Sequence, residues 1–149
     1  MKKTIALVAH DNRKEDLIQW VGWNAKILAK QKLICTGTTG KLVLAELSKH
    51  TKRDIDITML KSGALGGDQQ LGSMIAEGNI DIMIFLWDAM TAQPHDVDVK
   101  ALLRLAVVYN ITIANNRSTA DYIISSPLFK DENYEPIIKD YGKYINRSI

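Results

Sequence analysis

Hydrophobic positions along the chain follow two alternating rhythms. Thr4 to Ala9 is a continuous apolar run of strand length, which is typical of a strand covered on both faces. From Leu17 to Leu28 the apolar residues instead return every three or four positions, and this spacing predicts a helix packed on a sheet by one face. Asp11 is placed to cap the start of that helix. The chain therefore opens with a strand followed by a helix.

The same succession of strand and helix recurs four more times. Further strands are predicted at Leu33–Cys35, Ile55–Met59, Ile80–Leu86 and Ile111–Ala114. Further helices are predicted at Leu42–Ser48, at Gln69–Glu77 before Gly78, at Val97–Tyr109, and from a Ser118–Asp121 capping box to Pro127. Because strands alternating with helices form parallel sheets with right-handed crossovers, we predict an α/β fold. It would be one doubly wound domain with a five-stranded parallel sheet and helices on both faces, in three layers similar to flavodoxin.

That domain is expected to span residues 1–149. The segment from Lys130 to Ile149 is more polar and less periodic than the rest. We expect this tail either to dock as a short strand and helix or to reach a neighbouring subunit.

Composition narrows the function classes. The chain has 149 residues, 46% of them hydrophobic and 24% charged, values typical of a globular domain. A formal charge of +2 gives no general electrostatic reason to expect nucleic acid or a membrane surface as partner. The run Ile5–Ala9 is far shorter than a signal or spanning segment, and the lone Cys35 allows no internal disulfide. We therefore expect a cytoplasmic protein in a reducing compartment.

Polar side chains follow every predicted strand. Because ligands of open α/β sheets bind outside the carboxyl ends of the strands, these residues are expected to share one rim. They are His10 and Asp11, then Thr36 to Gly40, then Ser62, Gly63 and Asp68, then Asp88, His95 and Asp98, and finally Asn115 and Asn116.

The second of these groups reads TGTTG and joins a strand to a helix. Small residues there let backbone N–H groups and a helix N-terminus converge on one anion, so the motif predicts a site for a phosphate monoester. A tight turn with a threonine N-cap is the alternative. Lys14 and the pair Ser62–Gly63 could add donors. Neither the P-loop nor the dinucleotide-binding fingerprint is present.

Two side chains on the rim are candidates for proton chemistry. Asp68 follows two glycines and suits a general base, although it could equally be the N-cap of its helix. A neutral His95 could donate to a developing oxyanion, with Asp98 fixing its tautomer, or be an ordinary loop histidine. His10 is either a turn residue or a substrate ligand. The histidines lack metal-ligand spacing, so we predict no metal.

Several motifs occur in the order seen in the methylglyoxal synthase family. They are VAHD, TGTTG, SGxxGGDQQ, IFLWD, TAQPHDVDVKALLRLA and TADYI, and the resemblance runs from about Ile5 to Phe129. It implies cleavage of dihydroxyacetone phosphate to methylglyoxal and inorganic phosphate, without a cofactor, by a cytosolic homohexamer that phosphate inhibits.

The resemblance also assigns residues by matching motif. It implies that Asp68 is the catalytic base, that His95 acts at the substrate oxygens, and that Asp98 supports them. Asp11 and Asp88 are expected to support the site, and Arg147 resembles an arginine that reaches an adjacent subunit, with its spacing offset by one. The substrate- and phosphate-binding positions would be His10, Lys14, Thr36, Gly37, Thr38, Thr39, Ser62 and Gly63.

Two other functions remain open at this point. A non-catalytic anion-binding regulatory domain, similar to the allosteric domain of carbamoyl phosphate synthetase, would need the phosphate site alone. A phosphosugar isomerase would use the same base and donors but keep the phosphate on its substrate.

Overall fold

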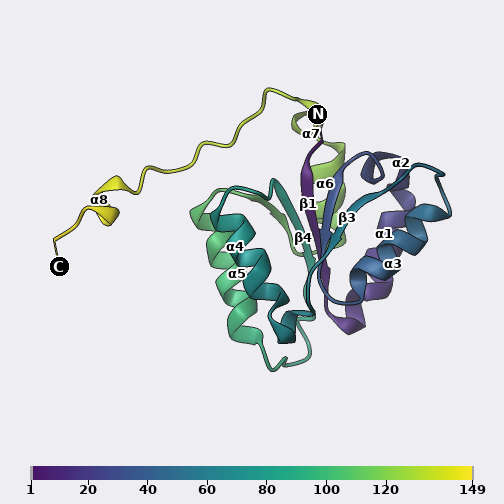
Figure 1. The fold of residues 1–149 in the computed structure, drawn as a ribbon, viewed down its shortest axis with the longest axis horizontal. Coiled ribbons are helices and arrows are strands. Elements are labelled where there is room, and N and C mark those ends of the chain that lie inside the picture. The colour runs from purple at the N-terminus through teal and green to yellow at the C-terminus, as the bar shows by residue number, and fades with distance from the viewer. Residues whose placement is uncertain (1, 149) are drawn as a thin grey trace.

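A computed structural model describes residues 2–148 and has a five-stranded, all-parallel sheet in the order β3-β2-β1-β4-β5 (Figure 1). The strands are β1 (Thr4–Ala9), β2 (Lys32–Cys35), β3 (Asp56–Met59), β4 (Ile82–Leu86) and β5 (Thr112–Ala114). The predicted doubly wound α/β fold is confirmed. Strand β4 starts later than predicted, because Asp81 instead accepts a hydrogen bond from the Thr4 amide at 2.8 Å.

Helices cover both faces of this sheet (Figure 1). On one face lie α1 (Lys14–Trp23), α2 (Ala25–Leu28), α3 (Thr39–Ser48) and α6 (Arg117–Ser125), and on the other lie α4 (Gly67–Ala76) and α5 (Asp96–Val108). Short turns of helix complete the list: η1 (Asp11–Arg13), η2 (Gly63–Leu65), α7 (Pro127–Lys130) and α8 (Gly142–Ile145).

Strand β1 lies at the centre of the molecule. Its side chains alternate between two apolar clusters, with Leu7 facing α1 and α3 and Val8 facing α4 and α5. Burial on both faces explains why this strand reads as a continuous apolar run. Cys35, at the end of β2, is 1% exposed, and burial raises the pKa of its thiol to about 12.

Three predicted helix starts are wrong. Asp11 does not cap α1 but begins η1, and its carboxylate pairs with Lys14 Nζ at 2.6 Å. The cap of α6 is Asn116, whose side chain accepts the Thr119 amide at 2.9 Å, rather than a Ser118–Asp121 box. Helix α3 begins at Thr39 instead of Leu42, so the last two residues of the TGTTG motif lie in its first turn and Thr38 is its N-cap.

The other boundaries differ less. Asn24 separates α1 from α2 within the stretch predicted as one helix, and its side-chain amide donates to the Trp20 carbonyl at 2.9 Å. Helix α6 ends at Ser125, and Pro127 occupies the first turn of α7, which Ser126 caps.

The C-terminal segment projects from the body of the molecule, as the yellow end of the ribbon in Figure 1 shows. It holds α8 but no strand between residues 131 and 148, so only the helix of the expected docking elements is present. Two hydrogen bonds attach its middle to the region where α5 ends: Asn110 donates to the Ile137 carbonyl at 3.0 Å, and the Tyr141 hydroxyl donates to the Val108 carbonyl at 3.2 Å. Within residues 2–148, no helix is both long and apolar enough to cross a bilayer.

Candidate active site

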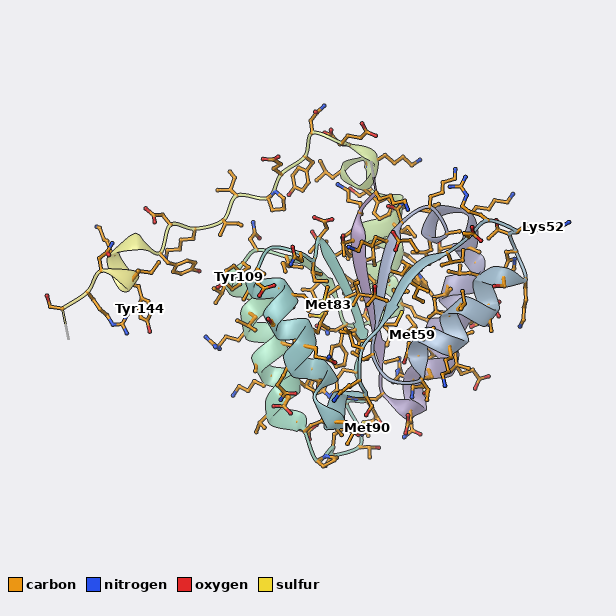
Figure 2. All side chains as sticks on the ribbon, viewed as in Figure 1. Lys52, Met59, Met83, Met90, Tyr109 and Tyr144 are labelled. Carbon is orange, nitrogen blue, oxygen red and sulfur yellow. The ribbon has the colours of Figure 1, made fainter. Side chains whose placement is uncertain are left out.

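A cavity of about 330 Å³ opens at the carboxyl ends of the strands. The strand order reverses between β1 and β4, and such a reversal is where open α/β sheets bind ligands. In Figure 2 this rim is the lower end of the molecule, where Met90 marks the loop after β4. Eleven of the residues predicted from the sequence line the cavity: His10, Asp11, Lys14, Thr36, Gly37, Thr38, Thr39, Ser62, Gly63, Asp68 and His95.

The TGTTG turn forms one wall of this cavity. Thr38 occupies the N-cap position of α3, but its hydroxyl makes no capping hydrogen bond and instead accepts one from Lys14 Nζ at 2.9 Å. The hydroxyl of Thr39 is buried and bonds to no described residue. Gly37 has φ +54°, a left-handed conformation that favours glycine. A lysine, hydroxyls and a helix N-terminus therefore converge here, as an anion site requires.

A second loop completes that wall. The Gly37 amide donates to the Lys61 carbonyl at 3.2 Å, and a Cβ on Gly37 would lie 3.2 Å from the Ser62 Cβ. The amides of Thr38, Ser62 and Gly63 donate to no other residue within 2–148. These three N–H groups, on residues that line the cavity, are available for the oxygens of a phosphate.

Asp68 lies on the opposite wall. It is the second residue of α4, and Gly66, with φ +108°, holds the N-cap position, so the alternative reading of Asp68 as a cap is wrong. Its side chain is 3% exposed, and its Oδ2 makes no hydrogen bond to any part of the chain that the structure describes. Burial raises the pKa of Asp68; His95 opposes this shift, while the charge of Asp98 adds to it.

His95 lies directly beside that carboxylate, with Nε2 3.5 Å from Asp68 Oδ2. Gly63 packs against both groups, because a Cβ there would lie 2.9 Å from Asp68 Oδ1 and 2.9 Å from His95 Nε2. The other ring nitrogen, Nδ1, is buried without a described partner, so the expected hydrogen bond from His95 to Asp98 is absent. Asp98 lies outside the cavity, in a groove between α4 and α5 that Asp68 also lines.

His10 presents its ring from the end of β1. Its Nδ1 accepts the Asp88 amide hydrogen at 3.0 Å, so the neutral ring carries its proton on Nε2. That Nε2 is buried and bonds to no described residue, and the His10 ring meets the His95 ring edge to face at 5.5 Å. Burial first, and then the nearby His95, lower the pKa of His10. A neutral donor is therefore built into the site.

Asp88 does not line the cavity but connects two of its loops. Its carboxylate accepts Asn12 Nδ2 at 3.0 Å and the Met90 amide at 3.1 Å, and these two bonds lower the pKa of Asp88. Asp88 was expected to support the site, and its backbone amide orients the His10 ring by donating to Nδ1. Asn12 and the cavity residue Gln93 were not predicted from the sequence, although both follow strands at the same rim.

Arg147 lies far along the projecting tail (Figure 1), beyond the position of Tyr144 in Figure 2. Its guanidinium stacks 3.7 Å from the Tyr144 ring and donates to the Tyr144 carbonyl at 2.6 Å. Within one chain it does not line the cavity. Across residues 2–148 no group of three or more His, Cys, Asp or Glu side chains could hold a metal ion.

Comparisons with known proteins identify the family and the fold. The model of the MGS-like domain family matches residues 17–115. A methylglyoxal synthase of Leptospira interrogans is 54% identical over 145 residues, which are 97% of this chain and 93% of the relative. One from Oleidesulfovibrio alaskensis is 55% identical over 146 residues, 98% of this chain and 95% of the relative. The crystal structure of methylglyoxal synthase from Elizabethkingia anophelis NUHP1 superposes with a TM-score of 0.88 at 53% identity, covering 99% of this chain and 93% of that one.

Proposed function

The chain belongs to the MGS-like domain family, and on that premise we propose that it is a lyase that converts dihydroxyacetone phosphate to methylglyoxal and inorganic phosphate. One observation carries the proposal: a buried carboxylate with an unpaired oxygen lies beside His95, in the same cavity as the anion site. Proton abstraction needs such a carboxylate, and the anion site is what would bind a phosphate ester.

Asp68 is the base in this proposal. It removes a proton from the carbon next to the carbonyl, and the electrons of that C–H bond form an enediolate. A carboxylate is a weak base in water, but burial, which raises the pKa of Asp68, brings it closer to the strength the reaction needs. The unpaired Oδ2 is free to receive the proton.

His10 and His95 stabilise the enediolate oxygens. The neutral ring of His10 can donate from Nε2, and one such donor at an oxyanion is worth about 2.7–4 kcal/mol in enzymes where it has been measured. His95, next to Asp68, is placed to move a proton between the two oxygens.

The anion site decides the product. As the enediolate collapses to an aldehyde, its electrons form a new C=C bond and break the bond between carbon and the phosphate oxygen, and phosphate leaves with that pair. This step needs the breaking bond held perpendicular to the enediolate plane. Lys14 and the threonine turn would hold it there and stabilise the departing dianion. The resulting enol becomes methylglyoxal after a proton returns to carbon.

A product assay tests the proposal. Incubating the protein with dihydroxyacetone phosphate should release methylglyoxal and inorganic phosphate in equal amounts, each measured separately. Glyceraldehyde phosphate as the product would identify an isomerase instead. If the substrate is unchanged and the protein still binds inorganic phosphate, the function would be that of a regulatory anion-binding domain. Against that alternative, a phosphate sensor has no use for an unpaired buried carboxylate, which costs stability.

We also propose that the protein is a cytoplasmic homohexamer that phosphate inhibits, with Arg147 contacting a neighbouring subunit. The projecting tail supports the subunit contact, because Ile137 and Ile145 are 87% and 73% exposed on it. Arg147 supports the same proposal, since it does not line the cavity of its own chain.

A further inference from the structure

The segment Lys61–Gly63 touches both halves of the site. On one side the Lys61 carbonyl accepts the Gly37 amide of the threonine turn at 3.2 Å. On the other side Gly63 packs against Asp68 and His95 so closely that a Cβ would lie 2.9 Å from each. The position of this segment therefore sets how the anion site is oriented relative to the base.

Gln70 holds this segment from α4. Its Oε1 accepts the Lys61 amide hydrogen at 2.9 Å. Gln70 lies within one turn of Asp68 on the same helix. The Gly67 amide also donates to the Ser62 carbonyl, at 2.8 Å. The side chain of Gln70 is exposed and lies outside the cavity lining, so it has no direct part in the chemistry.

The chain of hydrogen bonds is continuous. Gln70 accepts the Lys61 amide hydrogen, and the Lys61 carbonyl in turn accepts the Gly37 amide hydrogen in the anion site. The positions of Asp68 and of the anion site therefore both depend on helix α4. A shift of about 1 Å in such an arrangement can cost on the order of 10²-fold in rate, because a reacting bond leaves its required orientation.

We propose that Gln70 is a positioning residue which, through Lys61, orients the anion site relative to Asp68 and so favours expulsion of phosphate over return of the proton. This inference rests on the proposed function. Once the enediolate has formed, it has two fates: the proton goes back to carbon and substrate is regenerated, or the bond to the phosphate oxygen breaks. Loosening the segment should favour the first fate.

The test compares Gln70→Met, which keeps the shape but loses the acceptor, with Gln69→Met, its exposed neighbour, whose side chain makes no hydrogen bond within the described chain. The assay runs in D₂O and measures deuterium in recovered dihydroxyacetone phosphate per methylglyoxal formed. For Gln70→Met the ratio should rise by about 10-fold or more, with kcat falling and KM changing little. Gln69→Met should match the wild type. Because it is a ratio, a smaller folded fraction does not change it.

Gln70→Glu should restore the wild-type ratio, since a carboxylate oxygen can also accept the Lys61 amide hydrogen. Amide hydrogen exchange gives a readout without substrate: Lys61 should lose protection in Gln70→Met and keep it in Gln70→Glu. If the wild type makes methylglyoxal but the ratio or the protection is unchanged in Gln70→Met, the inference is wrong and the function stands. A wild type that makes no methylglyoxal overturns both.

Discussion

At the scale of single residues, the site is made of groups whose burial is unfavourable. Asp68, His10 and His95 each have a buried ring nitrogen or oxygen without a described partner. A buried, unpaired polar group costs about 1–3 kcal/mol. In the proposed function, the free energy of folding offsets this cost for a base and two donors that are ready to meet substrate oxygens.

Asp68→Asn should abolish turnover and make the protein more stable at neutral pH. Because the folded pKa of Asp68 is raised, ionisation destabilises the folded state as pH rises above the unfolded value of about 3.9. The gain of the variant, about 1–3 kcal/mol at pH 7, should therefore shrink as pH falls through that region. Unfolding in urea at pH 4 to 8 measures it. If the variant and the wild type are equally stable at every pH, burial does not destabilise the charged form of Asp68.

The same residues show what sequence can predict. Asp68, His95 and His10 could be selected because each follows a strand at the ligand-binding rim. Their contacts could not, because the 3.5 Å between His95 and Asp68 depends on how α5 packs against α4. For the same reason, the absence of the expected hydrogen bond between His95 and Asp98 could not be predicted.

At the scale of elements, the loops after β1, β2, β3 and β4 enclose the site. Periodicity placed the start of α3 at Leu42 because it follows apolar residues, whereas the helix begins at Thr39 and buries Gly40 against Met59. A small residue that packs closely carries no hydrophobic signal. Strand order and layers were predictable, since they follow from the succession of elements; helix starts were not, since they depend on local hydrogen bonds such as that of Asn116.

Gly63→Ala should lower kcat/KM by about 10²-fold while the fold persists. The added methyl group would lie 2.9 Å from both Asp68 Oδ1 and His95 Nε2 and push the pair apart. Steady-state kinetics and far-ultraviolet circular dichroism measure the two effects. Gly22→Ala is the matched control: its Cβ meets only the flexible end of Glu46, far from the cavity, so activity should be retained. Comparable activity in both variants would show that Gly63 is not tightly packed.

At the scale of the whole molecule, the site and the tail lie at opposite ends of the sheet. The cavity opens at the carboxyl ends of the strands, whereas the segment after α7 leaves from the amino ends (Figure 1). Its apolar side chains Ile137 and Ile145 are 87% and 73% exposed, and exposed apolar surface of this kind marks an interaction site. In the proposed homohexamer, another copy would bury them.

Deleting residues 137–149 should therefore shift the protein to a smaller assembly, as measured by sedimentation velocity. Arg147→Ala, which leaves Ile137 and Ile145 in place, should keep the assembly. If the truncated chain sediments like the full one, the tail is not a subunit contact. The contacts that the tail would make in the proposed assembly could not be predicted from its sequence, because they would lie outside the chain that carries it.

The burial of Cys35 has a practical consequence for following that tail. Thiolates attack dicarbonyls such as the proposed product, but the only cysteine of the chain is 1% exposed with its pKa raised to about 12, so it stays protonated and out of reach. The unsubstituted protein should therefore not react with a maleimide label. A cysteine introduced in place of the 64% exposed Tyr144 would be its sole reactive thiol, and a dye attached there would report subunit association in real time.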